Sequence, residues 1–230
     1  MVDAAMNHYR IGLFHSHVRR RFREEVAFLL RPHPNIAIPL VNVYETYNIT
    51  AGPTAVVSVP VPKETLYGLL RYHPGSIQPD LILSDIVSAM THLHQIPNRW
   101  HGSLSPEIIE IKDGRAIIND YGYYLSHDDY YRPHPSHLAP EVLDLSQKPD
   151  RSVDSYAFGI IMIELYSGHL AFDLEEPNDI INKVMQGDLP PIPSNMPEGH
   201  AALCRRCISR NTMERPSMEE IKLYLSGQPL

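Results

Sequence analysis

The stretch that decides the fold is HGSLSPEIIEIKDGRAIIND, residues 101–120, which is followed by Tyr121 and Gly122. Its second half holds two short apolar runs joined by Asp113 and Gly114. An Asp-Gly pair between two strand-like runs is a strong signal for a tight β-hairpin. We therefore expect a hairpin over residues 109–120, with Asp120 at its end.

The two ends of this stretch resemble the catalytic loop and the metal-binding turn of protein kinases. In active members these motifs are H-R-D-L-x-x-x-N and D-F-G. His101 and Leu104 match the first motif, and Asp120 to Gly122 match the second. Ser103 stands at the position of the catalytic aspartate, and Ile108 stands at the position of the metal-binding asparagine.

These two substitutions remove the chemistry that the family uses. The kinase aspartate orients the substrate hydroxyl and accepts its proton. Ser103 is a neutral alcohol without an accessible basic form, and Ile108 has no oxygen to offer to Mg²⁺, which binds oxygen ligands. We therefore expect no catalytic residue in the degenerate loop of His101, Ser103 and Ile108, which is the pattern of a pseudokinase.

Further kinase-like motifs follow in the expected order. Ala139-Pro140-Glu141 resembles the motif that closes the activation segment, and Asp154 stands where kinases use a buried aspartate to hold the catalytic-loop backbone. Arg215 matches the arginine that pairs with the glutamate of that closing motif, here Glu141. The resemblance covers about residues 16–226, and its second half is most similar to the tyrosine-kinase-like branch, including pseudokinases of the integrin-linked-kinase type.

The first sixty residues resemble a kinase small lobe without its first hairpin. Apolar residues recur at helical spacing over 16–30, and the HPNI that follows resembles the passage after the kinase C helix. The resemblance assigns nucleotide-binding roles to Arg10, Glu25, Val59, Val61 and Asp120. Asp120 is either a metal ligand or a retained turn residue that binds nothing, and the second interpretation is favoured because Ile108 offers no oxygen to a metal. No glycine-rich phosphate loop precedes them, so either the gene model is truncated or the lobe lacks that hairpin.

The predicted fold is therefore an α+β, bilobal, protein kinase-like fold. We expect residues 1–60 to form a truncated small lobe with the C helix and two later strands. Residues 61–230 are expected to form a mainly α-helical large lobe with the family's helices D to I. ATP and Mg²⁺ stay open as ligands, because adenine recognition at Val59 and Val61 would use backbone groups.

Other clusters have a functional and a structural interpretation. Cys204 and Cys207, three apart on an expected helix, are either a redox pair or two core side chains; the structural interpretation is favoured because no second pair completes a zinc site. The thirteen histidines show no zinc motif. The arginines of 19–23 form either an anion-binding run or a solvated helix face. Four tyrosines are either phosphorylation sites or a packed surface: Tyr123, Tyr124, Tyr130 and Tyr131.

Composition bounds the partners and the compartment. The net charge is −7, which argues against general nucleic-acid binding. No apolar run has the length needed to span a bilayer. Two cysteines do not form a disulfide framework, so we expect a reducing, intracellular, cytoplasmic location.

Two functions are carried forward. The first is a pseudokinase that acts as a signalling scaffold or allosteric binding module for a protein partner, such as an active kinase. The second is an ATP-dependent Ser/Thr or Tyr protein kinase that transfers phosphate to protein by an atypical mechanism, or a fragment of a longer active kinase. The first hypothesis rests on Ser103 and Ile108, which replace the catalytic aspartate and the metal-binding asparagine. The second rests on Asp120, which is retained, and on the backbone groups that remain open to adenine.

Overall fold

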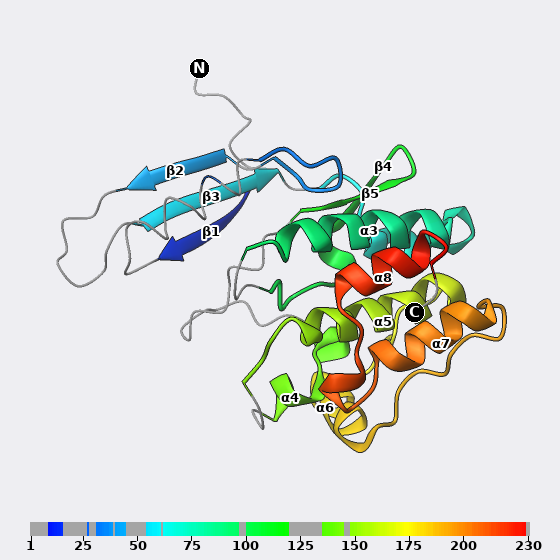
Figure 1. Ribbon diagram of the computed structural model, residues 1–230. Coiled ribbons are helices and arrows are strands. Elements are labelled where there is room, and N and C mark those ends of the chain that lie inside the picture. The colour runs from blue at the N-terminus through cyan, green and yellow to red at the C-terminus, as the bar shows by residue number, and fades with distance from the viewer. Residues whose placement is uncertain are drawn as a thin grey trace.

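The computed structural model describes residues 9–15, 27, 31–38, 40–44, 54–60, 62–96, 100–119, 135–144 and 148–228. It combines helices with two small antiparallel sheets (Figure 1). Several predicted features lie outside the described residues: most of the helix over 16–30 with Glu25 and the arginine run, Val61, the turn at Asp120, and the four tyrosines.

The first sheet has three strands, β1 (Tyr9–His15), β2 (Leu40–Tyr44) and β3 (Thr54–Pro60). Their order is β1-β3-β2, and both pairings are antiparallel. Valines and threonine favour an extended backbone in β3, and Pro60 ends the strand. In Figure 1 this sheet lies to one side of the helices.

The second sheet is the predicted hairpin, formed by β4 (Ile109–Lys112) and β5 (Arg115–Ile118). Its turn has positive φ angles at both central residues, 51° at Asp113 and 74° at Gly114. A two-residue hairpin turn of this hand needs such angles, which is why Asp-Gly predicts it. Asp85 fixes the hairpin to the neighbouring helix, because its carboxylate accepts two bonds from Arg115 and one from the Ala116 amide.

The remaining elements are helices and short 3₁₀ turns. The α-helices are α2 (Leu66–Tyr72), α3 (Pro79–Leu93), α4 (Pro140–Leu143), α5 (Ser152–Ser167), α6 (Pro177–Gln186), α7 (Glu198–Cys207) and α8 (Met218–Leu225). Short 3₁₀ turns are η2 (Pro74–Ser76), η3 (Pro106–Ile108), η4 (Pro135–His137) and η5 (Thr212–Glu214). Within the described ranges, no helix has both the length and the apolar character that a bilayer crossing requires.

Helix α5 is the centre of the helical part. Nearly all its side chains are buried, and it contributes to two apolar clusters, one shared with α3, α7 and α8 and one shared with α4 and α6. A helix that is apolar all round is typical of a protein interior. Gly159 allows close contact with α7, because a Cβ there would lie 2.8 Å from Cβ of Cys207 and 2.6 Å from Cγ2 of Ile208.

Candidate functional site

The loop at residues 100–105 is anchored to α5 by Asp154. This carboxylate is fully buried and accepts hydrogen bonds from the amides of His101 and Gly102, each at 2.7 Å. Nε2 of His94, at the end of α3, lies 2.7 Å from the same carboxylate. Hydrogen bonds to a carboxylate are stronger than neutral ones, so the loop backbone is held firmly.

Ser103 bonds to the imidazole of His101 rather than to a carboxylate. Its Oγ lies 3.2 Å from Nδ1 of His101, and its own amide donates to the same nitrogen at 3.3 Å. An imidazole nitrogen that receives an amide proton is the acceptor of the ring, so the ring proton of a neutral His101 is on Nε2. Both residues are buried. The hydroxyl of Ser103 therefore serves the loop's internal structure.

Ile108 is part of the apolar core. Its side chain is fully buried, and its carbonyl accepts a hydrogen bond from the Asn119 amide at 2.8 Å. The side chain of Asn119 is also fully buried, and its Nδ2 donates to Glu110 at 3.4 Å. A hydrocarbon at position 108 cannot ligate Mg²⁺, so the described part of the loop does not fit a kinase-like metal site.

The predicted nucleotide-binding set is assembled only in part by the described residues. Arg10 on β1 and Val59 on β3 are cross-strand partners in the first sheet. Glu25, Val61 and Asp120 lie outside the described residues, so the expected pairing of Arg10 with Glu25 stays a prediction.

Glu141 and Arg215 form a buried ion pair between α4 and the segment that follows η5. Nη1 of Arg215 lies 2.6 Å from Oε1 of Glu141, and Nη2 lies 3.0 Å from Oε2. The guanidinium also donates to the Ser209 carbonyl at 2.7 Å and lies over the ring of Tyr156, 5.1 Å from its centre. Burial, as the main cause, raises the pKa of the Tyr156 hydroxyl, so Tyr156 stays neutral.

Trp100, the single tryptophan of the chain, is the first residue of the loop at 100–105. It is partly buried and packs against the apolar cluster of α4, α5 and α6. Its Nε1 is buried and has no hydrogen-bond partner among the described residues. The indole therefore connects the loop to the second apolar cluster by packing alone.

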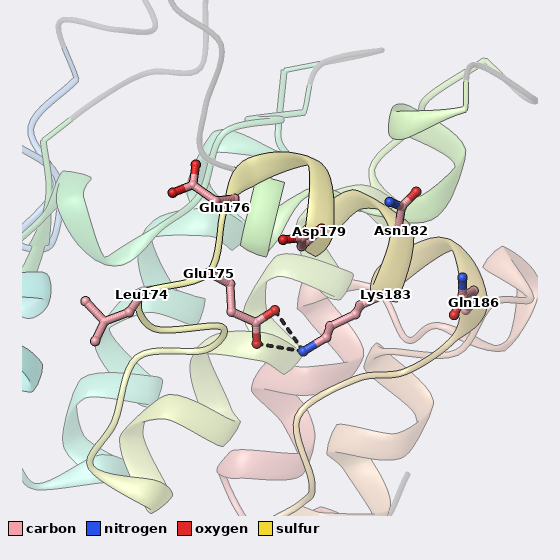
Figure 2. A pocket seen from close by; sticks show the side chains of 7 residues that line it. All are labelled: Leu174, Glu175, Glu176, Asp179, Asn182, Lys183 and Gln186. Carbon is pink, nitrogen blue, oxygen red and sulfur yellow. Dashed lines mark hydrogen bonds and ion pairs between the residues drawn. The ribbon is translucent and has the colours of Figure 1, made fainter.

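A hollow of about 570 Å³ opens beside α6, and its lining includes no residue of the loop (Figure 2). Nζ of Lys183 lies 2.8 Å from both carboxylate oxygens of Glu175. The lining is Leu174, Glu175, Glu176, Asp179, Asn182, Lys183 and Gln186. Three carboxylates around one ammonium that is already paired would repel a polyphosphate, so this hollow is not suited to a nucleotide.

The two cysteines are core residues. Both are buried, and the Cys204 thiol donates to the Gly159 carbonyl at 3.4 Å. Burial raises the pKa of Cys204 to about 12, and burial also raises the pKa of Cys207 well above its ordinary value. Neither thiol is a reactive thiolate near neutral pH. Among the described residues, no group of three or more potential ligands could hold a metal ion.

Sequence reasoning missed three histidine contacts. His94 binds Asp154, His137 binds Glu164, and the ring of His92 stacks on that of His33 with centroids 4.9 Å apart. The sequence indicated only that the histidines form no zinc motif. Their partners come from distant segments, so no local pattern reveals them.

The sequence is similar to those of several known protein kinases. A probable serine/threonine-protein kinase of Dictyostelium discoideum, pats1, is 29% identical over 214 residues, which cover 83% of this chain and 6% of that protein. Mitogen-activated protein kinase kinase kinase 12 of Rattus norvegicus is 30% identical over 140 residues, 58% of this chain and 15% of that protein. A probable inactive serine/threonine-protein kinase of D. discoideum is 28% identical over 147 residues, 61% of this chain and 8% of that protein.

The chain thus spans 6–15% of the length of these three relatives. The model of the family matches residues 14–225 of this chain. That range includes the anchored loop, the hairpin and all the described helices. The chain belongs to the protein tyrosine and serine/threonine kinase family.

Proposed function

We propose that this chain is a kinase-family domain that does not carry out ordinary phosphoryl transfer and that acts by binding a protein partner. One observation carries the proposal. At the position of the catalytic aspartate, the Ser103 hydroxyl is hydrogen-bonded to Nδ1 of His101 at 3.2 Å. A neutral alcohol engaged in this way cannot take a proton from a substrate hydroxyl.

The contacts that hold the fold support a role as a scaffold or allosteric module. Asp154 still binds the loop backbone, and Arg215 still binds Glu141. These contacts keep the helical surface in shape, whereas Ser103 and Ile108 no longer provide proton transfer and metal binding. The matching relatives include proteins named inactive and proteins named as kinases, so the relatives agree with both alternatives. The side chains of Ser103 and Ile108 favour the inactive one.

The proposal includes three more detailed predictions from the sequence. These are membership of the tyrosine-kinase-like branch, a bilobal division at about residue 60, and a cytoplasmic location. Two buried free thiols are compatible with a reducing compartment. If ATP binds, its adenine would meet the backbone of Val59 and Val61, and Asp120 would face its phosphates.

A phosphotransfer assay tests the main claim. Purified protein is incubated with labelled ATP, Mg²⁺ and a generic protein substrate, beside the variants Asp120→Asn and Ser103→Asp/Ile108→Asn. We expect no incorporation above background for the wild type. Incorporation by the wild type that disappears in Asp120→Asn would overturn the proposal and favour an atypical kinase.

Nucleotide binding is tested separately by thermal unfolding with ATP, with and without Mg²⁺. A ligand present at 100 times its Kd stabilises the folded state by about 2.7 kcal/mol. We expect that adding Mg²⁺ does not increase any shift caused by ATP, because position 108 offers no oxygen. A shift that appears only with Mg²⁺ would contradict this expectation.

A further inference from the structure

His137, in the turn η4, is buried beside a buried carboxylate of α5. Its Nε2 lies 2.9 Å from Oε2 of Glu164. His137 is 6% exposed and Glu164 is fully buried. A buried carboxylate is costly unless a positive charge or hydrogen bonds compensate it, so the protonation state of His137 matters for this contact.

Glu164 cannot turn away from His137 without losing a second bond. Its other oxygen, Oε1, accepts a hydrogen bond from the amide of Ala171 at 2.8 Å. Both carboxylate oxygens are therefore engaged, one by the loop after α5 and one by η4. This arrangement fixes the acceptor in place and leaves the imidazole proton as the variable part of the contact.

The other groups around His137 favour its charged form. The negative charge of Glu107, on η3, also acts on the imidazole. Helix α6 packs against η4 and buries only the apolar Ile180 and Val184. Glu141 of α4 is engaged by Arg215. Among the described residues, the charges that act on the imidazole are the carboxylates of Glu164 and Glu107.

The proton balance follows from these contacts. Burial lowers the pKa of His137, but the charge of Glu164, the hydrogen bond to Glu164 and the charge of Glu107 outweigh it, so the pKa lies above its ordinary value of 6.5. In the described part of the chain, Nδ1 of His137 is buried and has no hydrogen-bond partner. When the charged imidazole of His137 loses a proton, its bond to Glu164 becomes weaker. Nδ1 finds no new hydrogen-bond partner that would compensate for this.

We propose that His137 is a proton-dependent latch, which holds residues 135–144 against α5 when its imidazole is charged and loosens them when it is neutral. Because the folded state raises the pKa, the stabilisation is complete below pH 6.5 and is lost as the pH rises through the folded value. Residues 135–141 are the last part of the stretch 120–141, which the family resemblance assigns to the activation segment. The proposal rests on the family fold and not on the proposed loss of catalysis.

The first test uses the wild-type protein with isotope-labelled histidine. NMR follows the imidazole signals with pH, and the His137 signal is assigned by its absence in His137→Gln. We expect His137 to titrate above pH 6.5. Amide exchange of residues 136–144, corrected for the intrinsic rate, should lose protection over the same pH range, by up to tenfold for each unit of pKa shift.

Two variants provide the comparison. Glu164→Gln removes the carboxylate charge and should lower the pKa of His137, whereas His169→Gln changes an exposed histidine near the end of α5 and should change neither readout. Titration of the wild-type His137 at or below pH 6.5 would overturn the proposal even if a variant fails to fold. Protection of residues 136–144 that stays constant while His137 titrates would also overturn it.

Discussion

Replacing Arg215 by methionine removes the cation of the buried pair while keeping a long apolar side chain. The arginine donates two bonds to Glu141 and one each to the carbonyls of Ser209 and Ser152, and its side chain is fully buried. Charged hydrogen bonds contribute about 1.5–3 kcal/mol each, so the two bonds to Glu141 together account for about 3–6 kcal/mol. Breaking a buried pair from one side costs about 3–5 kcal/mol, which agrees with this sum.

We therefore expect Arg215→Met to lower the free energy of unfolding by about 3–5 kcal/mol. Most of this cost comes from Glu141, which is left buried with an uncompensated charge. Adding Glu141→Leu to the variant should recover most of the loss, because both charges are then absent. The control is Arg205→Met, whose pair with Glu198 is exposed and should contribute less than about 1 kcal/mol.

The assay is urea unfolding followed by far-UV circular dichroism, with the free energy extrapolated to water. All four proteins are measured at the same pH and salt concentration. A loss below about 1 kcal/mol for Arg215→Met, or a double variant as unstable as the single one, would refute the reasoning that a buried, uncompensated carboxylate dominates the cost.

Three further predictions concern single contacts. Asp154→Asn should lower the free energy of unfolding by about 2 kcal/mol or more in the same assay, because a carboxylate that holds the loop backbone is lost; an unchanged urea midpoint would contradict this. Gly159→Ala should lower the free energy of unfolding by about 1–3 kcal/mol, because the added Cβ pushes α5 away from α7. The control is Gly75→Ala, whose added Cβ meets no atom within 4 Å and should change the free energy of unfolding by less than about 0.5 kcal/mol. Equal effects of the two variants would contradict the packing argument. Burial, followed by the charge of His92, lowers the pKa of His33, so stability should fall as the pH drops below 6.5. In His92→Gln, the urea midpoint should fall less steeply as the pH drops below 6.5. An unchanged dependence of the midpoint on pH would contradict the claim that the charge of His92 acts on His33.

Local chemistry made much of the fold predictable. Asp113 and Gly114 adopt the positive φ angles that the hairpin requires. The buried residues of α3 recur at helical spacing in the sequence. The Glu141–Arg215 contact was expected from the resemblance of Arg215 to the arginine that pairs with the glutamate of the Ala-Pro-Glu motif.

The histidine contacts were not predictable in this way. Imidazoles carry no periodic signal, and each partner belongs to a segment that only tertiary packing brings close. His94 meets Asp154 because α3 and α5 lie side by side, and His137 meets Glu164 because η4 packs on α5. The position of the Ser103 hydroxyl was also unpredictable, because its acceptor could have been solvent, a carboxylate or, as observed, His101.

The placement of Trp100 has a practical consequence. Because it is the chain's single indole and adjoins His101, intrinsic fluorescence reports on this loop without a label. Its emission depends on the solvent near Nε1, which is buried. Emission measured during rapid mixing with ATP or with a candidate partner protein therefore shows in real time whether either one changes the surroundings of the loop.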